Sequence, residues 1–244
     1  MKNLLKLLLL LVLAVYLGLA VTVFNNPEVR QKCAAVDVIV KDSDVAGFIT
    51  PLEIRTILKD SKLYPVGQKM SNINCAEIEK VLARNPFIDN ITSYKTAGDH
   101  VYVTVTQRLP VMRIISDNGD NYYIDNKGKI MPIPNSSAHV AVVTGYVDRD
   151  FAVKELYTLG VFLQAHPLWD AQIEQINVTQ AKELELVPRV GEHIIFLGKP
   201  GNYEEKFEKL KTFYEKGLNQ VGWNKYSRIS LEFNNQIICT KKEK

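Results

Sequence analysis

The residues of this 244-residue chain that are able to do acid–base or metal chemistry are spread widely along it. The four histidines are His100, His139, His166 and His193. Each has turn or strand neighbours, where a solvated or singly hydrogen-bonded imidazole is the common outcome. The chain has no His-Glu-x-x-His, no Gly-x-Ser-x-Gly and no phosphate-binding glycine loop. We therefore expect no catalytic residue, no metal site and no cofactor, unless the fold gathers two or three histidines.

Two carboxylates lie close together in the sequence, at Asp117 and Asp120. Paired acids are typical of general acid–base catalysis. These two flank Asn118-Gly119, however, and Asn-Gly is a strong signal of a tight hairpin turn in which Asp side chains bond the local backbone. We interpret both as turn residues.

Charge and cysteine content argue against other functions. The formal net charge of +3 is spread along the chain without a basic stripe, so a nucleic-acid partner is not expected. Nothing predicts a small-molecule substrate either. Cys33, Cys75 and Cys239 are too far apart to read as a disulfide framework, and one thiol must stay unpaired or pair between chains. Cys75 and Cys239 are most simply small buried apolar residues.

The segment Leu4–Phe24 is apolar except for Lys6. As a helix it would be roughly 31 Å long, enough to cross a bilayer. Lys2 and Lys6 precede or begin it, and charges of both signs follow it. This distribution places the N-terminus in the cytoplasm and the body outside the cytoplasmic (inner) membrane, as a single-pass protein. A cleaved signal peptide is the alternative, since Gly18-Leu19-Ala20 offers a small-x-small site.

The first half of the exported body has the pattern of a strand, two helices and two strands. Val36–Val40 and Val101–Val105 alternate well enough for strands, and Phe87–Lys95 predicts another. Thr50-Pro51-Leu52-Glu53 and Asn74-Cys75-Ala76-Glu77 each fit a capping box that starts a helix. Two helices on one face of three strands would bury the apolar stripes.

The second half predicts an α+β arrangement with mainly antiparallel strands. Asn202-Tyr203-Glu204-Glu205 fits a third capping box, with Gly217 as the C-terminal stop of its helix. The expected strands include 111–115, 122–125, 140–144, 227–233 and 236–240, and a further helix over about 150–165 ends at His166-Pro167. Beyond that helix, apolar residues recur at Ile173, Ile176 and Val178, then at Leu184 and Leu186, and then over 194–197.

The order of elements resembles the cell-division family FtsQ, called DivIB in other bacteria, over nearly the whole chain. The residues that carry the resemblance are Val36-x-Val38, Asn85-Pro86-Phe87-Ile88, Val101-x-Val103-x-Val105-x-Gln107-Arg108-x-Pro110-Val111, Tyr122-Tyr123-Ile124-Asp125-x-x-Gly128, and the helix 202–217 followed by two strands. Two residues depart from the pattern. Gln107 stands where an acidic residue is usual, which weakens any expectation of a junction ion pair with Arg108, and Phe87 stands where Trp is common.

The resemblance implies a membrane-anchored protein with a POTRA domain and a β domain. The expected boundaries are a cytoplasmic end over 1–3, a transmembrane helix over 4–24, a linker over 25–35, a POTRA-like domain over 36–109, a β domain over 110–240 and a basic tail over 241–244. The resemblance also implies partners: FtsB/FtsL-like division proteins and, with them, the septal peptidoglycan-synthesis complex.

The last strand is the candidate binding site. It has a sequence neighbour on one side only, and an unpaired strand edge accepts an incoming strand. The resemblance implies the same use for Phe233, Gln236, Ile237, Ile238, Cys239 and Thr240. In the alternative reading, Ile237 and Ile238 simply divide between the core and the other face of the sheet. Neighbouring side chains in a strand point oppositely, so one of the two must face away from the core.

Three functions follow as hypotheses. The first is a non-enzymatic scaffold of the division machinery. The second is an exported POTRA-type binding module of an outer-membrane assembly system, which would require barrel strands downstream. The third is an exported hydrolase with a cleaved signal peptide, which would require a catalytic cluster formed by the fold.

Overall fold

The computed structural model describes residues 2–24 and 31–243. The first stretch is one helix, α1 (Lys2–Phe24). No helix within the described stretches combines the length and the apolar character that a membrane crossing needs. The span expected for Leu4–Phe24 therefore stays a prediction, and most of the expected linker, residues 25–30, lies outside the described residues. The chain divides into two compact units.

The first unit has the element order that the sequence predicts. Its elements are β1 (Ala35–Lys41), α2 (Pro51–Asp60), the 3-10 turn η2 (Met70–Asn72), α3 (Cys75–Leu82), β2 (Ile88–Lys95) and β3 (His100–Gln107). At α2 the Glu53 N–H donates to Thr50 Oγ1 over 3.2 Å, and the Glu53 carboxylate accepts the Thr50 N–H over 2.7 Å. Asn74 accepts the Glu77 N–H at the start of α3 over 3.3 Å. Both helices begin where their caps predict.

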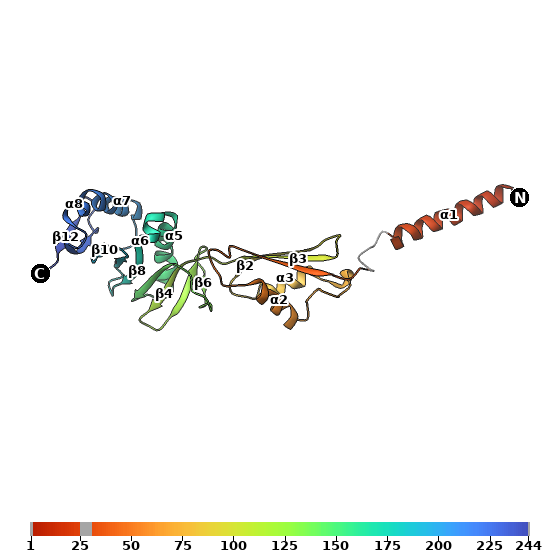
Figure 1. Ribbon diagram of the computed structural model, residues 1–244, viewed down its shortest axis with the longest axis horizontal. Helices are drawn as coiled ribbons and strands as arrows, with labels where there is room; N and C mark the ends of the chain where they lie inside the picture. The colour runs from red at the N-terminus through yellow and green to blue at the C-terminus, as the bar shows by residue number, and fades with distance from the viewer. Residues whose placement is uncertain (1, 25–30, 244) are drawn as a thin grey trace. The chain divides into compact units, whose positions relative to one another are not determined.

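The first unit buries one face of a three-stranded sheet. The strand order is β1-β3-β2, with β1 parallel and β2 antiparallel to β3. Val101, Val103 and Val105 of β3 are fully buried, and the residues between them are half-buried. Ile54 and Leu58 of α2 and Ile78 and Leu82 of α3 are buried too. Figure 1 shows both helices along the same face of this sheet.

The expected linker ends earlier than predicted, because residues 31–35 already belong to the first unit. The Gln31 carbonyl accepts the Met70 N–H over 2.9 Å, and the Cys33 N–H donates to the Gln68 carbonyl over 2.8 Å. Cys33 is buried, whereas Cys75 and Cys239 are only half-buried, the reverse of the prediction that the latter two are the buried ones; all three are free thiols. Burial, before any other influence, raises the pKa of Cys33.

The second unit contains residues 108–244 and also the loop 42–48, which precedes α2 in the sequence. Within this unit Ser136 Oγ donates to the Gly47 carbonyl over 2.7 Å. The buried ring of Phe48 lies 6.1 Å from that of Tyr123, centroid to centroid. The expected POTRA-like domain, 36–109, included this loop.

The elements of the second unit alternate between a sheet and short helices. The strands are β4 (Pro110–Ser116), β5 (Asn121–Asp125), β6 (Ile130–Met131), β7 (Ala141–Gly145), β8 (Ile173–Val178), β9 (Leu184–Pro188), β10 (Ile194–Gly198), β11 (Tyr226–Ser230) and β12 (Ile238–Lys241). The helical segments are α4 (Arg149–Phe151), the π-helical turn η3 (Ala152–Leu156), α5 (Tyr157–Ala165), α6 (Pro167–Gln172), α7 (Tyr203–Phe213), the π-helical turn η4 (Tyr214–Leu218) and α8 (Asn219–Val221).

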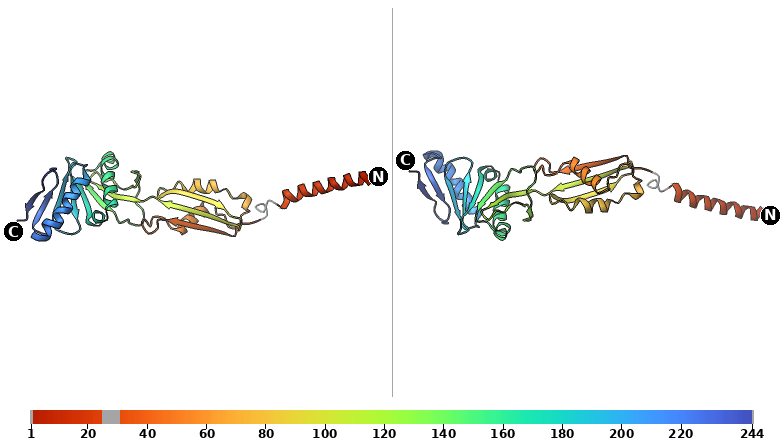
Figure 2. Two further views of the ribbon diagram at one scale, coloured as in Figure 1. Left: turned by 90° about the horizontal axis from the view of Figure 1, so that it is seen from above. Right: turned by 90° about the horizontal axis from the view of Figure 1, so that it is seen from below.

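The nine-stranded sheet has the order β12-β11-β10-β9-β8-β7-β4-β5-β6. It is mixed, with parallel pairs β4/β7, β7/β8 and β10/β11 among antiparallel ones. The crossovers β7-to-β8 and β10-to-β11 step in the same direction along the sheet. Since such crossovers are right-handed, their helices lie on one face, and Figure 2 shows α7 lying against the C-terminal strands. Side chains from both crossovers meet there: the Phe162 and Phe207 rings lie 5.0 Å apart.

Two predicted features of the long helix are wrong. Asn202 makes no capping bond, because its backbone is left-handed (φ 53°) and a capping side chain needs an extended backbone. Gly217 does not end the helix, which continues through η4 and α8 to Gly222 (φ 95°). Gly217 instead lies against the Phe213 ring, where a Cβ would come within 2.9 Å.

Several predicted boundaries also shift. Pro167 begins α6, a helix the sequence analysis did not predict, since proline suits a first helical position. The last two strands are shorter at the turn side than predicted, so Phe233, Gln236 and Ile237 lie in the connection between β11 and β12. Lys241 is part of β12 rather than of a solvated tail.

Candidate functional site: an edge strand beside an apolar groove

Strand β12 lies at one edge of the nine-stranded sheet and, among the strands that the structure describes, pairs with β11 alone. Its side chains alternate: Cys239 is half-buried, whereas Ile238 and Thr240 are exposed, Ile238 by 46%. Ile237, just before the strand, packs with Cys239 against the core. Ile237 and Ile238 thus do point to opposite sides, and β12 offers its outer backbone edge to solvent.

The backbone register tells which groups point outward. The Lys242 N–H donates to the Lys225 carbonyl over 3.1 Å, so it faces β11. Arg228 pairs with Thr240 and Ser230 with Ile238. Backbone groups of successive residues in a strand point to opposite sides. The N–H and C=O groups of Cys239 and Lys241 therefore point away from β11, toward the open edge.

A lysine of α7 holds the connection between β11 and β12 at its turn end. The Lys209 ammonium donates to the carbonyls of Phe233, over 3.0 Å, and Asn234, over 2.7 Å. It also lies 3.6 Å from the Glu205 carboxylate. Phe233 itself is 46% exposed, and Gln236 is exposed as well. The turn end of the hairpin is thus fixed to the helix while its side chains face solvent.

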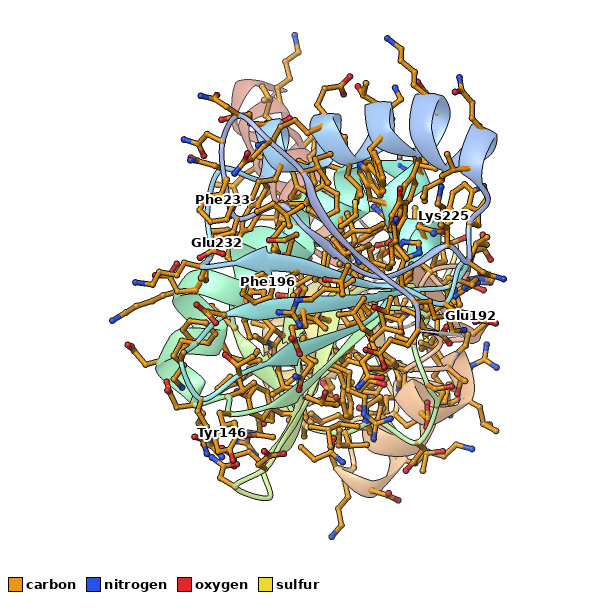
Figure 3. The ribbon with its side chains drawn as sticks, turned by 90° about the vertical axis from the view of Figure 1, so that its left-hand side faces the viewer. Tyr146, Glu192, Phe196, Lys225, Glu232 and Phe233 are labelled. Atoms are coloured by element: carbon orange, nitrogen blue, oxygen red, sulfur yellow. The ribbon has the colours of Figure 1, made fainter. Side chains whose placement is uncertain are left out.

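An ion pair holds the opposite end of the hairpin. The Lys242 ammonium pairs with the Glu192 carboxylate, on the loop before β10. The side-chain bond to Lys242 lowers the pKa of Glu192, so this carboxylate keeps its charge to lower pH than usual. In Figure 3, Glu232 and Phe233 lie at one end of the hairpin, and Glu192 and Lys225 lie at the other.

An apolar groove of about 680 Å³ adjoins the edge strand on its helix side. One wall is α7 and η4, including Thr212, Phe213 and Gly217; the other is the hairpin connection from Asn234 to Ile237. Glu205, Glu208, Lys209 and Lys216 complete the lining, so charges of both signs surround its apolar floor. Ile237, the residue before β12, is the point where the groove meets the strand.

On the face of the sheet away from the helices, Arg228 of β11 lies over an aromatic ring and forms an ion pair. The Arg228 guanidinium carbon lies 4.2 Å from the centre of the Phe196 ring, and Arg228 pairs with Glu185 over 2.9 Å. Asn177 donates to the same carboxylate group over 3.0 Å. Figure 3 places Phe196 between the two ends of the hairpin. On this face the charged groups of Arg228 and Glu185 already have partners within the sheet.

The structure does not bring the four histidines together. His100 bonds Asp37 over 2.7 Å, His166 bonds the Phe162 carbonyl over 2.7 Å, and His139 lies 3.4 Å from Arg189. His193 is buried against Tyr214. Within residues 2–24 and 31–243, no group of three or more His, Cys, Asp or Glu side chains is placed to hold a metal.

The two aspartates of the β4–β5 turn make contacts that belong to the turn and its neighbours. The Asp120 N–H donates to Asn118 Oδ1 over 2.8 Å, and Asp120 pairs with Arg149 over 3.0 Å. The Asp117 N–H donates to the Gly145 carbonyl over 3.0 Å, and Gly119 has φ 89°. The interpretation of these residues as turn chemistry agrees with this geometry.

The fold and the comparisons agree on the class of protein. Residues 31–106 match the family model of a POTRA-like domain. Residues 109–240 match the family model described as FtsQ/DivIB, C-terminal related. The chain thus has a POTRA-like unit followed by a unit of the FtsQ/DivIB division-protein class. No curated protein matches the chain. Because the second model covers more than half of it, the chain belongs to the FtsQ/DivIB, C-terminal related family.

Sequence reasoning missed the residues that support the edge. Lys209 binds a backbone carbonyl 24 positions away, and Lys242 binds a carboxylate 50 positions away. No local pattern in the sequence therefore identifies them. The spacing of Glu205 and Lys209 at i, i+4 is the one visible signal. The groove was missed because Gly217 was interpreted as a helix stop rather than as a residue in close contact with an aromatic ring.

Proposed function

We propose that the protein is a non-enzymatic bitopic scaffold of the bacterial division machinery that recruits FtsB/FtsL-like partners by strand addition to β12. The observation that carries the proposal is the edge position of β12, with the backbone groups of Cys239 and Lys241 directed outward. Family membership supports the division context. Through these partners the scaffold would act on the septal peptidoglycan-synthesis complex.

The geometry gives the added strand two different faces. Main-chain hydrogen bonds to Cys239 and Lys241 would supply affinity, and side chains at alternate positions would supply specificity. Those on the helix side would lie next to Ile237 and Cys239 and reach the groove. Those on the other side would lie next to the exposed Ile238 and Thr240.

The exposed ring of Phe233 is part of the same proposal. It lies in the connection whose backbone Lys209 holds in place, so its backbone is fixed before a partner binds. Interface energy concentrates on a few aromatic anchors. Phe233→Ala should therefore weaken partner binding by about 1–3 kcal/mol, with no loss of fold.

We further propose that α1 anchors this body to the cytoplasmic membrane, with residues 1–3 inside and both folded units outside. The support is the sequence of Leu7–Phe24, which has no charged residue, together with the family. Extraction of membranes at alkaline pH should leave the full chain in the pellet, and protease added outside the membrane should degrade the body. Release of the chain by alkali would remove this part of the proposal.

The experiment on the edge compares proline and alanine at the same position. Cys239→Pro and Lys241→Pro remove one outward N–H each, and proline is tolerated at a sheet edge when its missing donor faced solvent. Cys239→Ala and Lys241→Ala keep the backbone donor and serve as matched controls. We expect affinity capture of the FtsB-like partner from membranes to fall at least tenfold with each proline and to persist with each alanine.

Thermal unfolding of all four variants shows whether the fold is retained. If the proline variants unfold like their alanine partners and capture the same amount of partner, strand addition at β12 is wrong.

A further inference from the structure

The loop before β10 contains a buried histidine that the proposed binding site does not use. His193 is 1% exposed, and its Nε2 lies 2.9 Å from the Tyr214 hydroxyl of η4. Its Nδ1 is buried and has no hydrogen-bond partner among the described residues. A buried ionisable group with one unpartnered nitrogen is rare enough in folded proteins to ask what it does.

The surroundings of His193 are mostly aromatic rings and backbone. On one side lies the backbone of Gly191, where a Cβ would come within 2.7 Å of Nδ1. On the other, the rings of Tyr214 and Trp223 lie 5.6 and 6.4 Å from the imidazole, and 4.7 Å from each other. Protonation would place a positive charge among these rings, where burial disfavours it and the Trp223 backbone compensates only in part.

The same residues support both strands of the terminal hairpin. Trp223 lies in the turn that leads to β11, and Lys225 of that turn accepts the Lys242 N–H at the end of β12. Glu192, next to His193, pairs with Lys242. On the inner side, Gln172 of α6 donates to the Val190 carbonyl over 2.9 Å. The imidazole therefore lies where the loop, η4 and the base of the hairpin meet.

We infer that His193 is a proton-sensitive support of the β11–β12 hairpin: with a neutral ring it holds Trp223 and the hairpin base in place, and a protonated ring favours an open hairpin. One consequence rests on the proposed function: an open hairpin would present a disordered edge strand, and the protein would then capture less of its partner. The opening itself is a property of the free chain.

The direction of the pH effect follows from burial. Desolvation lowers the pKa of His193 below its ordinary value, an effect that the backbone of Trp223 offsets in part. The open form, with a solvated ring, takes up a proton near pH 6.5, and the closed form does so only at lower pH. Opening therefore grows as the pH falls below that value. If the closed ring stays neutral, the opening constant rises by up to about 30-fold between about pH 7.5 and pH 5.

Tyr214 and Glu192, the two groups beside the ring that lose a charge or gain one on titration, each keep one state over this range. Burial raises the pKa of the Tyr214 phenol, which remains neutral. Lys242 lowers the pKa of Glu192, which remains charged. Lys225 and Lys242 are the basic residues at this end of the hairpin. From α6, Trp169 lies near the Tyr214 ring and Gln172 bonds the Val190 carbonyl, and neither side chain is ionisable.

The test is hydrogen exchange of the full chain in detergent at about pH 7.5 and pH 5, expressed as protection factors to remove the intrinsic effect of pH. The wild type should lose protection up to about 30-fold in acid across 219–242. His193→Gln, which keeps a side chain able to bond Tyr214 but does not titrate, should show no such loss. His139→Gln, at an exposed histidine, should respond like the wild type.

Two results would overturn the inference: protection across 219–242 that is the same at both pH values in the wild type, or an acid response that persists in His193→Gln. Should that variant not fold, the NMR titration of the wild-type imidazole decides, since a ring that titrates at its ordinary pKa without change in the hairpin signals contradicts the inference. Loss of protection without partner capture at any pH would instead refute the proposed function alone.

Discussion

The Lys209 ammonium of α7 binds the backbone carbonyls of Phe233 and Asn234, at 3.0 and 2.7 Å. This contact joins a helix to the turn of the terminal hairpin through the main chain, independently of which side chains the turn carries. Two charge-assisted hydrogen bonds at a partly buried position restrict the turn more than a surface ion pair would.

Replacing Lys209 should therefore loosen the turn. We expect Lys209→Met, which keeps the aliphatic stem, to lower the free energy of unfolding by about 1–2 kcal/mol, measured by urea denaturation. Hydrogen exchange over 231–237 should accelerate in the same variant. Lys216→Met, on the same helix with an exposed side chain, is the control and should leave both measurements unchanged. If the two variants lose the same stability, the loss comes from the changed charge of the helix and not from the bonds of Lys209 to the Phe233 and Asn234 carbonyls.

A second pair, Arg108 and Asp125, fixes the start of the second unit. Asp125 is 1% exposed and accepts Arg108 Nε over 2.7 Å, together with the N–H groups of Lys127 and Lys129. Arg108→Leu would leave a buried carboxylate without its counter-charge, so we expect a loss of about 3–5 kcal/mol in unfolding free energy.

The exposed pair of Arg149 and Asp120 provides the contrast. Arg149→Leu should change stability little, since exposed ion pairs contribute little. If Arg108→Leu is equally mild, the Asp125 site must be accessible to water in solution. Calorimetry of the two variants beside the wild type measures the difference.

The amide of Gln107 is the third test. Gln107 is 1% exposed; its Oε1 accepts the Ile49 N–H over 2.9 Å, and its Nε2 donates to the Lys41 carbonyl over 3.2 Å. Gln107→Glu replaces the donor with a carboxylate oxygen, which would repel that carbonyl. We expect a loss of about 1–3 kcal/mol at neutral pH.

The loss should diminish as the pH falls. Burial raises the pKa of a carboxyl group above its unfolded value, and the introduced carboxyl group, once protonated, regains an O–H donor for the Lys41 carbonyl. Thermal melts from about pH 7.5 to pH 4.5 should show the Gln107→Glu variant approaching the wild type in acid. A difference that stays constant with pH would mean that the carboxylate escapes to solvent.

Cysteine labelling gives a fourth test, directed at the edge strand. Burial raises the pKa of the Cys239 thiol, so it should react slowly. Single-cysteine chains that retain Cys75 or Cys239 should each be labelled by a maleimide at alkaline pH. We expect the bulky label on Cys239 to abolish capture of the FtsB-like partner and the label on Cys75 to leave it unchanged. Capture by fully labelled Cys239 would place the partner elsewhere.

Much of the fold was predictable because local signals decide it. The caps at Thr50 and Asn74 begin their helices as predicted, the alternation of Val101, Val103 and Val105 identifies a one-sided strand, and Asn118-Gly119 forms its turn. Each of these depends on neighbours within a few positions, so the sequence carries the information directly.

The features that sequence reasoning missed depend on distant parts of the chain. Asn202 fits a capping pattern, but the preceding turn sets a left-handed backbone that the pattern does not contain. Lys242 was assigned to a solvated tail because its partner, Glu192, lies 50 positions earlier. At the candidate site, the last strand could be predicted from its place in the order of elements. The groove, the Lys209 contact and the Lys242–Glu192 pair could not.

The Phe48–Tyr123 contact has a practical consequence for recombinant fragments. A gene fragment beginning at Arg108 would encode the second unit without the 42–48 loop, leaving the aromatic ring of Tyr123 without the phenylalanine that faces it. A fragment ending at Gln107 would carry that phenylalanine into solvent. A cut between Gln107 and Arg108 therefore separates the two rings. A soluble product is best sought from a fragment that spans residues 31–243 or from the second unit with the 42–48 loop joined to it.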